Sequence, residues 1–255
     1  MPGVRSRARI AALATLGALA AAALGAVPAQ AAEVTFTTAD GVRISATYTP
    51  AGTGGAPAVI LAHMFGGDRS QWALLVPQLR RAGIASLAYD IRGMGRSTAL
   101  RGGRTYRPPG GSAYTNSMPR DVRAAVGWLR RRPDVDPGRI GIAGASVGAA
   151  IAYVSSGSGF GLRGAVAISP GRFPGSLDGT GVAGFRPRGV LFIADAAEIG
   201  ASRSFAARTA APKRVVQAPI AGHGTALLPD PTVRERIVAW LLARLRPAAA
   251  AQHAH

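Results

Sequence analysis

The sequence contains no cysteine and only one lysine, Lys213, among its 255 residues. The absence of cysteine excludes disulfide bonds, and it also excludes a lipid anchor attached through a cysteine. A domain of this length buries a core large enough to be stable without such cross-links. The missing cysteines therefore do not argue against a secreted protein.

Acidic residues are also scarce: 12 Asp and Glu stand against 30 Lys and Arg, which gives a formal net charge of +18. Such an excess attracts anionic surfaces or substrates at low salt. The arginines form no basic run interleaved with aromatic residues, and no helical pattern has a single basic face. Net charge alone is weak evidence for nucleic-acid binding, so we predict no nucleic-acid partner.

The N-terminal segment has the pattern of a secretory signal peptide. Three arginines among the first nine residues precede an apolar run from Ile10 to Val27, and Ala29-Gln30-Ala31 is a small-residue cleavage signal. The run is rich in alanine and glycine, so it is weakly apolar for a membrane-spanning helix. We predict a signal peptide over residues 1–31, cleavage after Ala31, a secreted mature chain and no stable membrane insertion after cleavage.

From residue 33 onward, apolar β-branched runs alternate with helical patterns. The predicted strands cover 33–38, 42–48, 56–62, 84–89, 139–145, 162–168, 189–194 and 214–220, and the predicted helices include 71–81, 119–131 and 232–245. The first two strands form an antiparallel hairpin around Ala39-Asp40-Gly41. The later alternation predicts an α/β fold with a mostly parallel sheet of about eight strands and helices on both faces.

Two long connections interrupt this alternation. Residues 97–118 are rich in Gly, Arg and Pro, and residues 170–187 carry no convincing helical pattern. Neither connection is long enough to form a second domain. The sequence therefore predicts one domain over residues 32–246 with little or no lid, followed by a disordered low-complexity tail over 247–255.

A candidate nucleophile lies where the strand 139–145 runs into a small-residue helix. Gly144-Ala145-Ser146-Val147-Gly148 is a G-x-S-x-G pattern, in which a sharp strand-to-helix turn exposes the serine at the end of a sheet. The turn is so tight that the residues flanking the serine must be small.

A candidate base follows the last predicted strand. Outside the tail, the chain has only two histidines, His63 and His223. His223 lies in a glycine-rich loop that the parallel sheet would place at its carboxyl edge, where ligands bind in open α/β folds. His63, Asp90 and His223 lie on different loops without the spacing of metal ligands, so we predict no metal or cofactor.

Four stretches together resemble the α/β-hydrolase superfamily over residues 33–246. They are the serine pattern, His63-Met64-Phe65-Gly66-Gly67 after one strand, Asp90 to Ser97 as D-x-R-G-x-G-x-S after the next, and Gly222-His223-Gly224. The resemblance is to small secreted serine esterases, lipase-like or dienelactone-hydrolase-like. It implies the chain order serine, acid, histidine.

The resemblance also implies roles for the loop residues. The oxyanion hole is expected from the backbone amides of Val147 and Phe65, with Met64 as the alternative to Phe65. His63 is expected to shape the oxyanion loop through hydrogen bonds, and Asp90 and Arg92 are expected to brace a tight glycine-rich turn.

The triad acid is expected just after the strand 189–194, where the sequence offers both Asp195 and Glu198. Members of the family commonly place the acid a few residues beyond the strand end, which favours Glu198. Asp195 is nearer the strand and is the commoner residue type, and Asp178 is a remote third candidate.

These residues predict a secreted serine hydrolase that cleaves small-molecule carboxylic esters through an acyl-enzyme. An acyltransferase or amidase using the same triad is the first alternative. The second is a catalytically inactive protein of the same fold that serves in binding.

Overall fold

The computed structural model describes residues 30–247, so the predicted signal peptide and tail lie almost entirely outside the described residues. Its sheet consists of β1 (Ala32–Thr37), β2 (Val42–Thr49), β3 (Ala56–Ala62), β4 (Ala85–Tyr89), β5 (Ala99–Leu100), β6 (Val135–Ala145), β7 (Ala165–Ile168), β8 (Arg188–Ala194) and β9 (Ala210–Gln217). Eight strands lie in the order β1-β2-β4-β3-β6-β7-β8-β9, and the two-residue β5 pairs with β2. The β1–β2 and β2–β4 pairs are antiparallel, whereas the pairs from β4 to β9 are parallel. The predicted mixed, mostly parallel sheet is confirmed.

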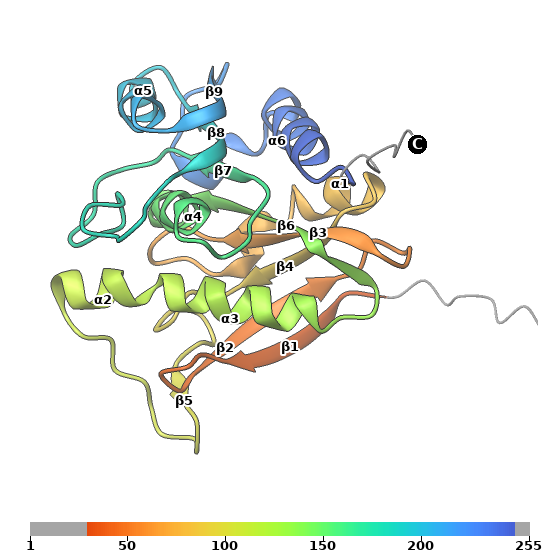
Figure 1. Cartoon of the computed structure of the whole chain (residues 1–255), viewed down its shortest axis with the longest axis vertical. Coiled ribbons are helices and arrows are strands. Elements are labelled where there is room, and N and C mark those ends of the chain that lie inside the picture. Colours follow the sequence, from red (N-terminus) through yellow and green to blue (C-terminus); the bar gives the residue numbers. More distant parts are fainter. Residues whose placement is uncertain (1–29, 248–255) are drawn as a thin grey trace, which may run out of the picture.

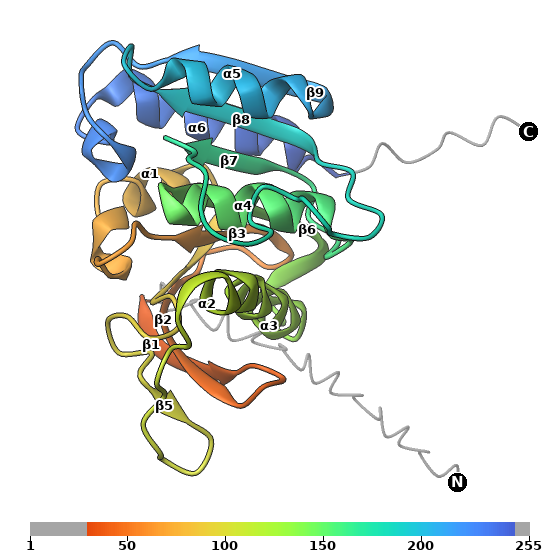
Figure 2. The ribbon, with the colours of Figure 1, turned by 90° about the vertical axis from the view of Figure 1, so that its left-hand side faces the viewer.

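Helices cover both faces of the sheet (Figure 1). They are α1 (Val76–Arg81), α2 (Gly111–Ser117), α3 (Pro119–Arg130), α4 (Val147–Gly157), α5 (Ile199–Ala207) and α6 (Pro231–Arg244), with short 3-10 helices η1 (Arg69–Trp72) and η2 (Gly224–Leu227). Buried side chains of α3, α4 and α5 form one core with one face, and those of α1 and α6 form a second core with the other. Figure 2 shows α4 and α5 on one side of β7 and β8, with α6 behind them.

The central strands are apolar on both sides because helices cover both sides. Every residue of β3, β4 and β7 is buried, as a parallel sheet between two helix layers requires. In α4, Tyr153 packs edge-on against Phe205 of α5, with ring centroids 4.9 Å apart. This pair packs α4 against α5, the two helices that directly follow Ser146 and Glu198.

The prediction of one continuous helix over 71–81 is wrong, because the segment forms two separate helices. The chain forms η1 first and begins α1 only at Val76, with Pro77 in the first turn. Proline lacks an amide hydrogen and disfavours a helical conformation in the residue before it, so a helix starts there more easily than it passes through. Trp72, Leu75 and Leu79 of this segment are nevertheless fully buried.

Other differences lie at the edges of the molecule. The connection 97–118 contains β5 and α2, which its glycine-rich and arginine-rich composition did not predict. The last strand runs over Ala210–Gln217 rather than 214–220, and most of its residues are exposed. An edge strand is held by backbone pairing on one side only, so it needs no continuous apolar run. The connection 170–187 contains no helix, as predicted.

The single lysine closes the end of α5. Nζ of Lys213, on β9, donates hydrogen bonds to the carbonyl oxygens of Ala206 and Thr209, both at 2.7 Å. A cation at a helix C-terminus satisfies carbonyl groups that have no partner inside the helix.

Between residues 30 and 247, no helix is long and apolar enough to cross a bilayer.

Candidate active site

Ser146 lies at the sharp turn between β6 and α4. Its backbone has φ 55° and ψ −116°, a strained combination for a residue with a side chain, and its amide donates to the carbonyl of Ile168 at 2.9 Å. Strain of this kind persists only where the surrounding structure enforces it. The turn is the one that the G-x-S-x-G pattern predicted.

The two glycines of the pattern let the chain close on itself. A Cβ atom at Gly144 would collide with the backbone of Gly148, and one at Gly148 would collide with the carbonyl groups of Ala62 and His63. These obstacles are backbone atoms, which cannot move aside as a flexible side chain can. Both positions therefore require glycine, which brings the N-terminus of α4 close to the end of β3.

Val147 is the first residue of α4 and follows Ser146 directly. Among the described residues, no acceptor is recorded for its backbone amide. Unpaired amides at a helix N-terminus, together with the helix dipole, favour negative charge nearby. The structure therefore leaves this amide available at the residue that follows Ser146.

His223 and Glu198 form a hydrogen-bonded pair at the same edge of the sheet. Nδ1 of His223 lies 2.6 Å from Oε1 of Glu198. Glu198 precedes α5 after β8, whereas His223 lies in the loop after β9, so two neighbouring parallel strands present them. With Nδ1 engaged by the carboxylate, Nε2 is the imidazole nitrogen left for a proton transfer.

The other candidate acids have different partners. Asp195 accepts hydrogen bonds from the backbone amides of Glu198 and Gly222, at 2.9 and 3.1 Å. These amides, that of Gly222 foremost, lower the pKa of the Asp195 carboxyl below its usual value. Asp178 accepts from the amide of Thr180 and lies 3.7 Å from Arg208. Of the three predicted candidates, only Glu198 contacts the imidazole.

The loops that carry Ser146 and His223 contact each other through their neighbouring residues. A Cβ atom at Gly224 would lie 3.4 Å from Cβ of Ala145 and would collide with the sulfur of Met64. The amide of Gly224 donates to Oγ of Ser169 at 2.9 Å, which fixes the loop against the end of β7. The residues adjacent to the serine and the histidine are thus packed together at one rim.

His63 is fully buried and braces the loop after β3. Its Nδ1 lies 2.6 Å from the carbonyl oxygen of Met64, and its Nε2 accepts the amide of Ile91 at 2.9 Å. These partners require a neutral ring with the proton on Nδ1, and burial lowers the pKa of His63 accordingly. The position fits the predicted role in shaping the loop.

Gln71 distinguishes the two amides considered for the oxyanion loop. Its Oε1 accepts the amide of Met64 at 3.0 Å, so this amide is already engaged. Gly67 leaves room for the Gln71 side chain, because a Cβ atom there would collide with it. No acceptor within the described chain is recorded for the amide of Phe65, which leaves Phe65 as the free donor.

Asp90 braces the turn that follows β4. Its carboxylate accepts the backbone amides of Arg69 and Arg96 at 2.9 and 2.8 Å, and its carbonyl accepts Oγ–H of Ser97 at 2.7 Å. A Cβ atom at Gly95, where φ is 49°, would collide with the Asp90 carboxylate. The D-x-R-G-x-G-x-S pattern is therefore explained by local bracing.

Arg92 is buried between two carboxylates. Its Nε donates to Asp121 at 2.8 Å and its Nη1 to Asp40 at 2.7 Å, and neither Arg92 nor Asp121 is exposed to solvent. Although partial burial acts to raise it, hydrogen bonds from Arg92, Thr38 and other donors hold the pKa of Asp40 well below its usual value. The cluster ties the turn after β4 to α3 and to the β1–β2 hairpin.

We expect Arg92→Leu to destabilise the fold by about 3–5 kcal/mol, because it leaves the buried Asp121 without a compensating charge. Arg120→Leu is the matched control, since the Arg120 side chain is 57% exposed and binds the same Asp40. Its expected effect is below about 1 kcal/mol. Urea unfolding followed by circular dichroism measures both, and equal values for the two variants would contradict the prediction.

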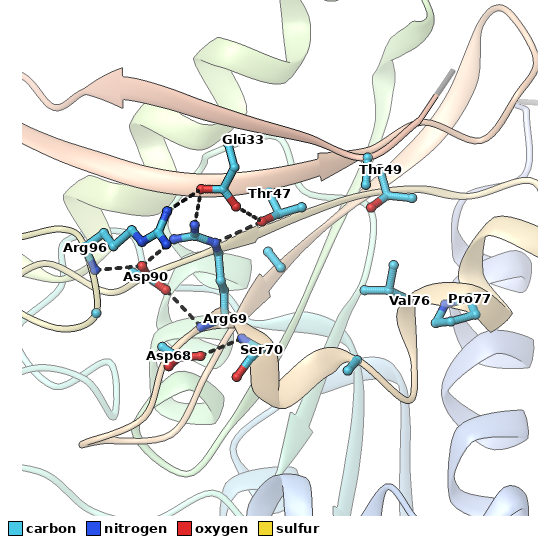
Figure 3. A pocket seen from close by; sticks show the side chains of 14 residues that line it. Glu33, Thr47, Thr49, Asp68, Arg69, Ser70, Val76, Pro77, Asp90 and Arg96 are labelled. Carbon is cyan, nitrogen blue, oxygen red and sulfur yellow. Dashed lines mark hydrogen bonds and ion pairs between the residues drawn. The ribbon is translucent and has the colours of Figure 1, made fainter. Parts of the chain in front are cut away.

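A separate hollow of about 510 Å³ lies between the β1–β2 pair, η1 and the start of α1 (Figure 3). Its arginines are paired within it: Arg69 contacts both Glu33 and Asp90, and Arg96 lies 3.4 Å from Glu33. Ser146, His223 and Glu198 do not line the hollow. It is therefore distinct from the candidate triad.

The comparisons with known proteins agree with this architecture. The sequence profile of the alpha/beta hydrolase family matches residues 59–254. The chain belongs to the alpha/beta hydrolase family. An uncharacterized protein of Mycobacterium tuberculosis is 38% identical to this alpha/beta hydrolase over 121 residues, which are 47% of this chain and 39% of that protein. The chain thus spans about two fifths of that relative's length.

Solved structures show the same fold at low identity. Esterase Pf2001 of Pyrococcus furiosus matches with a TM-score of 0.68 and 19% identity, covering 85% of this chain and 91% of that chain. The dienelactone hydrolase of Anabaena variabilis matches with a TM-score of 0.64 and 20% identity, covering 85% and 99%. The predicted alpha/beta hydrolase fold is confirmed.

Gln71 and Ser169 hold loops of the candidate site in this alpha/beta hydrolase, although the sequence predicted no role for either. Ser169 directly follows β7, and a polar residue at the carboxyl end of a buried parallel strand is a usable signal. Gln71 carried no such signal, because it lies in the segment 71–81 that was predicted to be one continuous helix.

Between residues 30 and 247, no group of three His, Cys, Asp or Glu side chains could hold a metal ion.

Proposed function

We propose that this alpha/beta hydrolase is a serine hydrolase that cleaves carboxylic esters with Ser146, His223 and Glu198. The observation that carries the proposal is the 2.6 Å contact between His223 and Glu198, because the loop of His223 also packs against Ala145, the residue before Ser146. A strained, glycine-flanked serine and an imidazole oriented by a carboxylate, on loops that pack together through their neighbouring residues, are the parts of an activated nucleophile.

In the proposed reaction, Nε2 of His223 takes the hydroxyl proton as Oγ of Ser146 attacks the ester carbonyl carbon. Glu198 holds the imidazole in the required tautomer and stabilises the imidazolium that forms. The imidazolium then gives its proton to the leaving alcohol, and an acyl-enzyme remains. Water attacks the acyl-enzyme with His223 again as base, which releases the acid and restores Ser146.

The amides of Val147 and Phe65 are proposed to bind the oxyanion of the tetrahedral intermediate. Val147 directly follows Ser146, and Phe65 lies on the loop after β3, which packs against the serine turn. Neither amide has an acceptor in the described chain. Each such donor contributes about 3 kcal/mol to lowering the barrier in enzymes where it has been measured. The Gln71 contact supports Phe65 over Met64, because the Met64 amide is already engaged.

The open surroundings favour small or exposed acyl groups. The His223 side chain is 52% exposed, and no helix covers the site from the connection 170–187. The structural neighbours include proteins named as an esterase and a dienelactone hydrolase, which fits small carboxylic esters as the substrate class.

We further propose that the chain is exported and cleaved after Ala31. The proposal is supported by the arginines, apolar run and small-residue signal at the N-terminus. The cleavage point falls immediately before Ala32, the first residue of β1, so cleavage would remove no residue of the sheet. Mass spectrometry of the exported protein tests this, and retention of residues 1–31 would contradict it.

The activity is tested with a fluorophosphonate probe and a panel of p-nitrophenyl esters of increasing chain length. We expect covalent labelling at Ser146, identified by peptide mass spectrometry, and the fastest turnover on short acyl chains. Amide probes and alcohol acceptors run in parallel separate hydrolysis of esters from amidase and acyltransferase activity. Absence of labelling in the folded protein would indicate a binding protein without turnover.

Gln71→Ala is expected to lower kcat about tenfold with little change in KM. The variant loses the hydrogen bond to the Met64 amide, which frees the loop that presents Phe65. One such bond contributes about 1–1.5 kcal/mol, which corresponds to about a factor of ten in rate. The control is Gln78→Ala on α1, whose side chain makes no hydrogen bond recorded in the described chain. Equal kcat values for the two variants would exclude this role of Gln71.

A further inference from the structure

We propose that Asp195 is a positioning residue that holds the acid and the base of the triad in one arrangement. This inference rests on the proposed function, but it concerns a carboxylate that the mechanism does not use. Asp195 directly follows the last residue of β8 and is only 9% exposed. It lies where a side chain can reach both loops that leave β8 and β9.

The two carboxylate oxygens of Asp195 contact different loops. Oδ1 accepts the amide of Glu198 at 2.9 Å, and Oδ2 accepts the amide of Gly222 at 3.1 Å. Glu198 is the residue that contacts the imidazole, and Gly222 directly precedes His223. One rigid planar group thus sets the distance between the backbone of the acid and the backbone of the base.

A second side chain fixes the opposite side of His223. Oγ of Ser169, at the end of β7, accepts the amide of Gly224 at 2.9 Å. The amides on both sides of His223 are therefore bound by side chains at the ends of adjacent strands. The histidine itself is half exposed, so its position depends on these anchors rather than on burial.

The role requires a carboxylate and not merely a polar residue. An ionised carboxyl group is an acceptor at both oxygens, whereas an asparagine amide offers one acceptor oxygen and an NH₂ group that only donates. Asp195→Asn can therefore bind one of the two backbone amides but not both. The variant keeps the size of the side chain and removes one anchor.

The test compares Asp195→Asn with Asp136→Asn, a matched control at the beginning of a strand rather than after its end. Asp136 also accepts a backbone amide, that of Gly138 at 2.9 Å, but it lies at the start of β6. We expect Asp195→Asn to lower kcat about tenfold with KM within about twofold, and Asp136→Asn to change neither. Unchanged kcat in folded Asp195→Asn would overturn the proposal.

A double-mutant cycle with Glu198→Gln separates positioning from an independent contribution. If Asp195 acts through Glu198 and His223, the double variant loses little more than Glu198→Gln alone, because groups that act as a unit are not additive. Losses that multiply would overturn the proposal. So would a loss in Asp195→Asn as large as that in Glu198→Gln, because Asp195 would then be the triad acid itself.

Amide hydrogen exchange tests the anchoring without any assay of turnover. In the folded wild-type protein we expect protection of the Glu198 and Gly222 amides, and in Asp195→Ala a selective loss of protection at both. Equal protection in the two proteins would overturn the proposal even if turnover were absent. If Ser146 is not labelled but this protection is lost, the proposed function fails and the anchoring stands.

Discussion

Ser146→Ala is expected to lower ester turnover about a million-fold while leaving the fold intact. The serine oxygen is the atom that the proposed mechanism makes covalent, and removal of the nucleophile alone costs about this much in a serine hydrolase where it has been measured. The residual rate comes from the amides of Val147 and Phe65 and from substrate binding. Burst kinetics with a p-nitrophenyl ester and loss of fluorophosphonate labelling measure the effect.

Ser156→Ala is the control for this variant. Ser156 lies on the same helix, α4, and its hydroxyl donates to the carbonyl of Tyr153 at 2.7 Å. We expect its turnover to match wild type. If Ser146→Ala hydrolysed esters at a rate comparable to that of Ser156→Ala, another group would attack the substrate, and the proposed mechanism would be wrong.

Glu198→Gln is expected to lower kcat about ten-thousand-fold. A glutamine amide carries no charge to stabilise the imidazolium, and its NH₂ group can donate to Nδ1 and favour the wrong tautomer of His223. The loss should far exceed the tenfold effect of Asp195→Asn, because Asp195 contacts only backbone amides and not the imidazole.

The matched control is Glu235→Gln on the exposed side of α6, which should keep wild-type turnover. Steady-state kinetics on one short-chain ester compare Glu198→Gln, Asp195→Asn and Glu235→Gln. If Asp195→Asn proved the more damaging change, Asp195 rather than Glu198 would be the acid of the triad.

Much of the fold could be predicted because its signals are local. A continuous apolar run such as Ala56–Ala62 can be satisfied only between two helix layers, and it forms β3 with the same bounds. The prediction of one continuous helix over 71–81 failed because it followed the apolar periodicity and not Pro77, which favours the start of a new helix. The predicted bounds of the edge strand β9 were four residues too late at its start, because exposed strands carry little apolar signal.

The candidate site was predictable where backbone geometry demands particular residues. Gly144 and Gly148 are required by collisions with backbone atoms, so the pattern around Ser146 identifies the turn. The choice between Asp195 and Glu198 could not be made from sequence, because both lie a few residues beyond β8. It depends on which carboxylate the turn before α5 directs at His223, and the triad assignment itself stays a prediction until it is tested.

The contact between Lys213 and the end of α5 has a practical consequence. Because this lysine is the only one in the chain, amine-reactive esters can couple only there or at the chain's amino terminus. Its hydrogen bonds to Ala206 and Thr209 place that attachment point at the opposite end of α5 from Glu198. A dye or surface linker attached at Lys213, with the terminal amine blocked beforehand, would therefore hold the molecule in one defined orientation.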